Sequence, residues 1–324
     1  MSMLKPIESV FKQADGIDIY MDIYLPDTAT KNNPAPILLW WHGGGLLQGT
    51  RKAVELAPYH VNAPSKRNIC IISADYRLAP QFRFPTILSD CAAAMNFLHS
   101  PTFASLVEGK ADPSRVVLSG SSAGGWLSLL CGTGIGFDES GLPRPPAVQG
   151  IAALYPITDI QDSFWTTKQH PVSYMGRIIS KDEVQPFLNP DDAGSRTASS
   201  ALDGPRAIFY HYMIQEAIEA ELLLGSTGIS PAAYSVAPTL KSLIDSPGKY
   251  SLPPTFIGHG ATDAEVPVTQ ARDVAASLEE LKKAGIDVEY EYEEIEGAGH
   301  FYDRESEMDS MYNFFSKVFK KLEY

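Results

Sequence analysis

The feature of this sequence that most constrains its fold is a series of short apolar segments that are continuous rather than alternating. Strands buried on both faces have continuous apolar runs, whereas strands with one face in water alternate apolar and polar residues. Because segments with helical spacing lie between these runs, the sequence predicts an α/β fold with a mainly parallel sheet flanked by helices. The runs are APILLWW (35–41), NICIISA (68–74), SRVVLSG (114–120), VQGIAALYP (148–156) and PPTFIGHG (253–260).

Outer elements of this sheet are indicated near the two ends of the chain. Residues 9–26 have the pattern of two strands joined by a turn at Asp15-Gly16, which is a hairpin signal. Residues 287–297 alternate strictly, with glutamates on one face and valine and tyrosine on the other. This alternation predicts a half-exposed strand near an edge of the sheet. Helices are expected over 268–285 and over 305–322.

One long segment, residues 160–250, interrupts the alternation of strands and helices. It contains no clear strand, it is rich in aromatic residues, and residues 204–225 have the pattern of one amphipathic helix. A segment of this length and composition predicts a helical cap over the sheet. We expect most of its aromatic side chains to anchor the cap and two to four of them to line a pocket. Residues 1–324 are then predicted to form a single domain with this insertion.

The composition excludes several classes of function. The net charge of −13 argues against nucleic acid or an anionic membrane surface as the main partner. No segment approaches the about 20 apolar residues of a membrane-spanning helix, and the first residues lack the apolar core of a secretory signal. We therefore expect a cytoplasmic protein whose partner is a small molecule.

Neither a metal nor an organic cofactor is expected. The three cysteines are odd in number, lie in apolar contexts and form no CxxC motif, which favours free buried thiols over disulfides or a zinc site. The segment GTGIGF (132–137) lacks the third glycine of a dinucleotide-binding motif. The cysteines are Cys70, Cys91 and Cys131.

The segment GSSAGG (120–125) fits the pattern G-x-S-x-G with Ser122 at its centre. It follows an apolar strand and precedes a helical segment, so Ser122 is expected on a sharp strand-to-helix turn that small neighbours allow to close. The N-terminus of the helix would favour the negative charge that develops during acyl transfer. Ser122 is therefore predicted to be a nucleophile, with an ordinary Gly/Ser turn as the alternative.

A second glycine-rich segment, HGGG (42–45), also ends an apolar strand. Consecutive glycines allow backbone N–H groups to approach a ligand without obstruction by side chains. Two of these amides, together with the N–H of Ala123, are predicted to stabilise an oxyanion, with a plain glycine-rich turn as the alternative. His42 is expected to order the loop rather than to act as a base.

A nucleophilic serine needs a base and a residue that orients the base. In this architecture the expected order along the chain is serine, acid, histidine. His300 in GAGHFYD and Asp263 in IGHGATDAEVP both follow predicted strands and fit that order. His259 is a rival base and Glu265 a rival acid. The remaining histidines are predicted to be surface or structural residues: His60, His99, His170 and His211.

Taken together, these motifs resemble the hormone-sensitive-lipase-like branch of the α/β-hydrolase fold, which includes arylacetamide deacetylase-like esterases. The resemblance spans nearly the whole chain. It implies oxyanion donors at Gly44, Gly45 and Ala123, and a structural role for Asp75 and Arg77. The motifs that carry it are HGGG (42–45), DYRLAP (75–80), GSSAGG (120–125), GATD (260–263) and GAGHF (297–301).

The sequence also departs from the family pattern. HGGG arrives at residue 42, which leaves little room for an N-terminal part of the cap, so the cap must come mostly from 160–250. Gln81 stands where the family often has an acidic residue. By family analogy, the last helix and the strand over 287–294 are possible surfaces of a homodimer.

The predicted activity is hydrolysis of carboxylic esters with small to medium acyl groups, through an acyl-enzyme on Ser122. His300 takes the proton of Ser122, and Asp263 holds the imidazole. Because His300 must be neutral to act, activity is expected to fall at acidic pH. Alternatives are an amidase or deacetylase, or a hydrolase of thioester, lactone or polyketide-like intermediates. A receptor for small molecules without catalysis and a lipase acting at an oil–water interface are also open.

Overall fold

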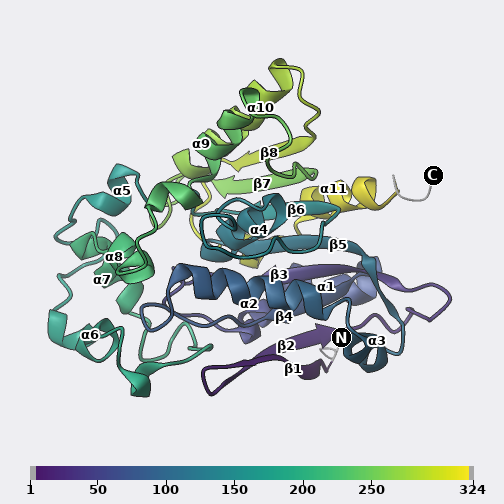
Figure 1. Ribbon diagram of the computed structural model, residues 1–324, viewed down its shortest axis with the longest axis horizontal. Coiled ribbons are helices and arrows are strands. Elements are labelled where there is room, and N and C mark those ends of the chain that lie inside the picture. The colour runs from purple at the N-terminus through teal and green to yellow at the C-terminus, as the bar shows by residue number, and fades with distance from the viewer. Residues whose placement is uncertain (1–4, 321–324) are drawn as a thin grey trace.

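The computed structural model describes residues 5–320 and contains one eight-stranded sheet, in the order β1-β2-β4-β3-β5-β6-β7-β8 (Figure 1). The continuous apolar runs of the sequence form its central strands, as predicted, and all residues of β4 and β6 are buried. The strands are β1 (Ile7–Ala14), β2 (Ile17–Tyr24), β3 (Ala35–Trp41), β4 (Cys70–Ala74), β5 (Ala111–Ser121), β6 (Gly150–Leu154), β7 (Thr255–Gly260) and β8 (Tyr290–Ile295).

Most of the sheet is parallel. The strands from β4 through β3, β5, β6 and β7 to β8 pair in parallel, whereas β1 pairs antiparallel with β2, and β2 with β4. The predicted hairpin is confirmed, because Asp15 and Gly16 join β1 to β2 with φ values of 51° and 75°. The alternating segment forms β8 at the opposite edge, as predicted. Parallel strands end on one side of the sheet, so the loops that follow them meet there.

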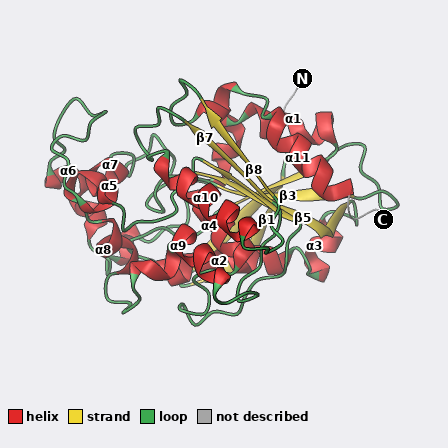
Figure 2. Cartoon of the chain, turned by 90° about the horizontal axis from the view of Figure 1, so that it is seen from above, coloured by secondary structure: helices red, strands yellow, loops and turns green. Residues whose placement is uncertain are grey.

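Helices cover both faces of the sheet, which confirms the predicted α/β class. The side chains of Trp41, Phe84 and Trp126 belong to one buried apolar cluster, and those of Trp40 and Phe314 belong to a second cluster on the other face. Figure 2 shows α2, α4, α9 and α10 on one side of the sheet and α1 and α11 on the other. The bounds are α1 (Pro58–Arg67), α2 (Phe84–Phe97), α3 (Pro101–Leu106), α4 (Ala123–Thr133), α9 (Val236–Lys241), α10 (Thr269–Lys283) and α11 (Asp309–Lys320).

The segment 160–250 consists of short helices and turns, and β-pairing there is limited to an isolated bridge between Gly49 and Ser200 among the described residues. Figure 1 places α5 to α8 together at one end of the molecule, beyond the sheet. We call this segment the cap. Besides α9 it contains α5 (Ser163–Thr166), α6 (Lys181–Leu188), α7 (Phe209–Glu216), α8 (Glu219–Leu224) and the 3-10 turns η2 (Ala193–Ser195), η3 (Pro231–Tyr234) and η4 (Ser242–Ile244).

Two expectations about helices need correction, and one helix was missed. The single helix expected over 204–225 is two helices, because Ala217 has a left-handed φ of 57° between α7 and α8. The last helix begins at Asp309 rather than at 305, since residues 302–305 form the 3-10 turn η5 (Tyr302–Glu305). The end of that predicted helix, at residues 321 and 322, lies outside the described residues. Helix α1 was not predicted.

Two buried side chains anchor the cap to the loops beside the sheet. Arg206 donates hydrogen bonds to the carbonyls of Leu47 and Ala79 at 3.0 and 2.9 Å and to the Oε1 atom of Gln81 at 2.6 Å. Burial lowers the pKa of Arg206 to about 10. The amide nitrogen of Gln81 donates to the carbonyls of Phe187 and Asn189. Gln81, which departs from the family pattern, is therefore part of the junction between the cap and the sheet.

Candidate active site

Ser122 stands on a sharp turn between β5 and α4. Its backbone angles are φ 57° and ψ −121°, a conformation that costs about 1–3 kcal/mol for a residue other than glycine. A Cβ atom on Gly120 would lie 2.2 Å from the carbonyl of Gly124, and a Cβ on Gly124 would lie 2.0 Å from the carbonyl oxygen of Trp41. The turn therefore closes only because the positions two residues before and two residues after Ser122 are glycine, in keeping with the small neighbours predicted from the sequence.

The HGGG loop runs directly beside Ser122. A Cβ atom on Gly43 would lie 3.0 Å from the Cβ atom of Ser122. Gly44 and Gly45 have φ values of 104° and 63°, and no acceptor among residues 5–320 takes up the N–H of either glycine. The His42 Nδ1–H donates to the carbonyl of Gly43 at 2.8 Å, so this ring orders the loop. Two unpaired amides thus lie next to a serine hydroxyl at the end of the strands.

Ala123 is the first residue of α4 and follows Ser122 directly. The first four N–H groups of a helix have no carbonyl partner within the helix. Its amide is therefore placed at the same strand-to-helix turn as the hydroxyl of Ser122. The three predicted oxyanion donors all come from segments that flank this one turn.

His300 and Asp263 form a hydrogen-bonded pair. The distance between Nδ1 of His300 and Oδ2 of Asp263 is 2.7 Å. The other carboxylate oxygen of Asp263 accepts the N–H groups of Glu265 and Val266 at 2.9 and 3.0 Å. Burial acts to raise the pKa of Asp263, but the hydrogen bonds from His259 and His300 outweigh burial and hold that pKa well below its usual range. Asp263 is therefore a carboxylate with a fixed orientation.

The two rival residues have other positions. His259 is fully buried, and its Nε2–H points to the carbonyl of Val266 at 3.0 Å and to Oδ2 of Asp263 at 3.3 Å. It supports the acid rather than facing Ser122. Glu265 contacts Asp263 through its backbone N–H, and burial raises the pKa of its carboxyl group. The geometry brings Asp263, and not Glu265, to the imidazole of His300.

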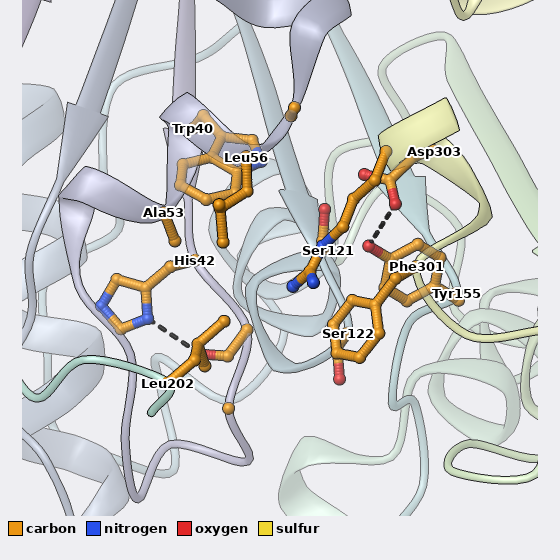
Figure 3. A pocket seen from close by; sticks show the side chains of 14 residues that line it. Trp40, His42, Ala53, Leu56, Ser121, Ser122, Tyr155, Leu202, Phe301 and Asp303 are labelled. Carbon is orange, nitrogen blue, oxygen red and sulfur yellow. Dashed lines mark hydrogen bonds between the residues drawn. The ribbon is translucent and has the colours of Figure 1, made fainter. Parts of the chain in front are cut away.

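Two hollows meet at Ser122. The apolar hollow, of about 40 Å³, is seen in Figure 3, where Trp40, Ala53 and Leu56 lie across from Phe301 and Tyr155. The polar hollow, of about 220 Å³, contains His300. Both hollows share Gly44, Ser122, Leu202, Phe301 and Arg304; the apolar hollow is completed by His42, Gly43, Ala57, Ser121 and Asp303, and the polar hollow by Gly45, Gln48, Ala207, Tyr210, His211 and Glu265.

Ser122 and His300 line the same polar hollow, without a hydrogen bond between their side chains in the described structure. Hydrogen bonds between catalytic groups are often long before substrate binds. Chemically, the arrangement supplies a hydroxyl, an imidazole held by a carboxylate, and unpaired amides around one point. This is the set of groups that nucleophilic acyl transfer requires.

A buried polar cluster beneath the site was not predicted. The two carboxylate oxygens of Asp303 accept the hydroxyls of Tyr59 and Tyr155, each at 2.7 Å. The ring of Tyr155 also lies against the imidazole of His300, with 4.5 Å between ring centroids. The sequence contains only a weak signal for this cluster, which is that Asp303 lies three residues after His300.

Side chains of the cap reach the site, although among the described residues Tyr210 is the one Phe, Trp or Tyr residue of the cap that lines either hollow, fewer than the two to four expected. His211, predicted to be a surface or structural residue, instead lines the polar hollow with His300. Burial and the nearby charge of His300 lower the pKa of His211. The hydroxyl of Tyr210 donates to the carbonyl of Glu265 at 3.0 Å, and its ring lies where a side chain on Gly45 would stand. Both residues belong to the aromatic run that marked the cap in the sequence.

Asp75 and Arg77 of the DYRLAP motif have structural positions, as the resemblance implied. Asp75 accepts two hydrogen bonds from Arg51, one from the backbone N–H and one from Nη1, both at 2.6 Å. Arg77 forms two side-chain hydrogen bonds with the buried carboxylate of Asp90, at 2.8 and 2.7 Å. Neither side chain lines either hollow.

The described residues contain no group of three or more side chains placed to hold a metal ion. Across residues 5–320, every helix is too short or too polar to cross a bilayer. The three cysteines are buried and unpaired.

The sheet order, the turn at Ser122 and the loops around it define an α/β-hydrolase. A family model described as BD-FAE matches residues 21–189, which is more than half of the chain. The chain belongs to this BD-FAE family, which is a family of α/β-hydrolases. The coarser part of the predicted resemblance is thereby confirmed, while the hormone-sensitive-lipase-like branch stays a prediction.

Curated relatives include large biosynthetic proteins. The non-reducing polyketide synthase pkbA of Emericella nidulans is 29% identical over 94% of this chain, which spans 13% of that protein. Lipase 2 of a Moraxella species is 34% identical over 38% of this chain and 28% of its own length. Nearly the whole of this chain matches pkbA, but the match covers only a small part of that much longer protein.

Solved structures show the same fold. An α/β-hydrolase superfamily protein from Enterococcus faecalis aligns with a TM-score of 0.63 at 20% identity, covering 93% of both chains. Esterase 2 of Thermogutta terrifontis aligns with a TM-score of 0.61 at 18% identity, covering 98% of this chain and 96% of its own. At these identities the likeness is one of fold.

Proposed function

We propose that this protein is a serine carboxylic-ester hydrolase that works through an acyl-enzyme. The observation that carries the proposal is the pair of His300 and Asp263, 2.7 Å apart, beside a serine on a strained turn. The unpaired amides of Gly44 and Gly45 flank the same serine. A likeness in part of the chain to Lipase 2 supports hydrolysis of ester bonds.

In the first half of the reaction, Oγ of Ser122 forms a bond to the carbonyl carbon while its proton passes to Nε2 of His300. The electron pair of the carbonyl moves to oxygen, and the resulting oxyanion accepts hydrogen bonds from Gly44, Gly45 and Ala123. Collapse of this intermediate breaks the bond to the leaving oxygen, which receives the proton from His300. An alcohol leaves, and the acyl group stays on Ser122.

The second half repeats these steps with water. His300 takes a proton from water as the water oxygen bonds to the acyl carbon, and it returns that proton to Oγ of Ser122 as the ester bond breaks. Asp263 stays ionised throughout and stabilises the imidazolium, in keeping with its lowered pKa. No metal or organic cofactor takes part in the proposed reaction.

The proposed substrates are esters with small to medium acyl groups, because the apolar hollow beside Ser122 has a volume of about 40 Å³. A second candidate is the same chemistry on a thioester or lactone in a biosynthetic pathway. It is favoured by the polyketide synthases, such as pkbA, that match this chain along nearly its whole length. A cytoplasmic location, a homodimer and a single domain with a cap over 160–250 stay predictions.

The test compares wild type with Ser122→Ala on p-nitrophenyl esters from acetate to laurate, with an anilide and a thioester of the same acyl group. We expect kcat/KM for short esters to fall at least about a thousandfold in the variant. Ser119→Ala is the matched control, because Ser119 is a buried serine on the same strand that lines neither hollow. Equal activity of wild type and Ser122→Ala would reject the nucleophile, and faster cleavage of the thioester would favour the second candidate.

A further inference from the structure

The two hollows at Ser122 differ in polarity and in which catalytic groups line them. This difference indicates which hollow receives the acyl group of an ester and which receives its leaving group. His300 lines the polar hollow but not the apolar one. In the proposed reaction His300 protonates the leaving oxygen, so that oxygen must lie beside His300. The leaving group therefore occupies the polar hollow and the acyl group occupies the apolar hollow. This step rests on the proposed function.

Arg304 stands where the two hollows meet. Its guanidinium carbon lies 3.8 Å from the centroid of the Phe301 ring, a cation–π contact that holds the side chain. Within residues 5–320 the guanidinium makes no hydrogen bond and no ion pair. The adjacent carboxylate of Asp303 accepts hydroxyls from Tyr59 and Tyr155 on its two oxygens, and it forms no ion pair with Arg304 among the described residues.

Glu265 is the carboxylic acid that lines the polar hollow together with Arg304, yet the two side chains form no ion pair. Burial, which favours the neutral acid, raises the pKa of Glu265 despite the opposing effects of His300 and Arg304. The chain as a whole has a net charge of −13, so this cation is not part of a generally basic surface. Arg304 is thus an unpaired guanidinium that lines the compartment assigned to the leaving group and also borders the compartment assigned to the acyl group.

We propose that the substrates of this protein carry a carboxylate or a phosphate on the leaving group, and that Arg304 binds this anion. A planar guanidinium matches both groups, because it offers parallel N–H donors to two oxygens. The preferred substrate is then an ester of a small apolar acid with an anionic alcohol or phenol. Arg304 acts on specificity, and the bond-breaking steps remain those of Ser122 and His300.

The first test measures binding without turnover. Ser122→Ala protein is titrated by calorimetry with 4-hydroxybenzoate, 4-hydroxyphenyl phosphate and the neutral methyl 4-hydroxybenzoate. We expect at least one anion to bind about tenfold more tightly than the neutral compound, and Arg304→Gln in the same background to abolish that difference. The tighter anion identifies the group. Equal binding of all three compounds would overturn the proposal, whether or not the protein is an esterase.

The second test measures specificity with the acetyl esters of the same three phenols. We expect Arg304→Gln to lower kcat/KM for the preferred anionic ester about tenfold more than it lowers kcat/KM for the neutral ester. Arg304→Lys keeps the charge without the planar fork and should retain part of the preference. A loss shared equally by all three esters would show a structural role and overturn the proposal.

Two controls separate the possible explanations. Arg144→Gln removes a positive charge from the exposed loop beyond the far end of α4 and should not change the preference. Methyl hydrogen succinate carries its carboxylate on the acyl side, and sensitivity of its hydrolysis to Arg304→Gln would overturn the assignment of the leaving group. An inactive wild type with binding of anions that depends on Arg304 would reject the proposed function and retain the anion site.

Discussion

The Nε2 atom of His259 lies 3.3 Å from Oδ2 of Asp263, the same oxygen that accepts the hydrogen bond from His300. The carboxylate is therefore held by two imidazole rings as well as by two backbone N–H groups. The Nδ1 atom of His259 has no hydrogen-bond partner among the described residues, so this ring is bound through its Nε2 atom alone. His259 is thus a positioning residue for the acid of the proposed triad.

Replacing this ring tests that role. In His259→Phe the Asp263 carboxylate loses one donor, so its pKa should rise toward the ordinary value and His300 should be held less firmly. We expect kcat for a short ester to fall about tenfold with little change in KM. The loss should be similar across pH 5 to 8, because a carboxyl group whose pKa does not exceed its ordinary value is ionised throughout that range. Profiles of kcat against pH from 5 to 8 measure both effects.

His99→Phe is the matched control, because His99 is exposed and lies at the end of α2, away from both hollows. Its profile should follow wild type. If His259→Phe also kept the wild-type profile over this range, His259 would have no part in orienting Asp263.

Removal of Asp303 should destabilise the fold and loosen the site. Asp303→Ala leaves the buried hydroxyls of Tyr59 and Tyr155 without acceptors, and each unsatisfied group costs about 1–3 kcal/mol. We expect the free energy of unfolding in urea to fall by about 2–4 kcal/mol. Glu305→Ala alters an exposed acid in the same 3-10 turn and should change stability by less than about 0.5 kcal/mol. Similar losses in both variants would contradict this account.

Two buried histidines predict how stability depends on pH. Burial lowers the pKa of His42 to about 4 and that of His60 to about 3, from an ordinary value of 6.5. Between pH 6.5 and about 4 the unfolded chain binds protons at these positions and the folded chain does not. The free energy of unfolding should therefore fall as the pH falls through this window, by up to about 1.4 kcal/mol per pH unit for each histidine.

The variant His60→Phe removes one of these groups. Its free energy of unfolding, measured in urea at several pH values, should depend less steeply on pH between 6.5 and 4 than that of wild type. His99→Phe, at an exposed position whose side chain makes no hydrogen bond or ion pair among the described residues, should keep the wild-type slope. An unchanged slope in His60→Phe would show that His60 does not stay neutral in the folded protein.

The order of apolar and polar residues predicted most of the sheet, because it depends directly on which faces of a strand are buried. The continuous apolar runs form the central strands, and the strict alternation near residue 290 forms the edge strand β8. Helix α1 escaped prediction because it contains Pro58 and Pro64 and has no clear apolar stripe. The break between α7 and α8 has no local signal either, since an alanine in left-handed conformation at position 217 reflects packing of the cap.

In the site, too, features set by residues close in the sequence were predictable, whereas features set by packing of distant segments were not. Ser122 and the glycines around it were predictable because steric limits act between neighbours in the sequence. Asp263 and His300 were predictable because each follows a strand, and such loops meet at one edge of a parallel sheet. The position of His211 in the polar hollow depends on how the cap returns over the sheet. No local pattern reports contacts of that range.

The position of Tyr210 in the cap bears on how enzymes of this kind acquire new substrates. Its ring lies over Gly45 of the oxyanion loop, and its hydroxyl binds the loop that carries Asp263. The cap is thereby fastened to the HGGG loop and to the loop that carries Asp263, which are two parts of the proposed active site. Exchange of residues 160–250 between relatives would preserve turnover only when an aromatic residue at this position is inherited with the glycine beneath it. A change of cap in this chain would therefore also change the contacts of the two loops that hold the proposed catalytic groups.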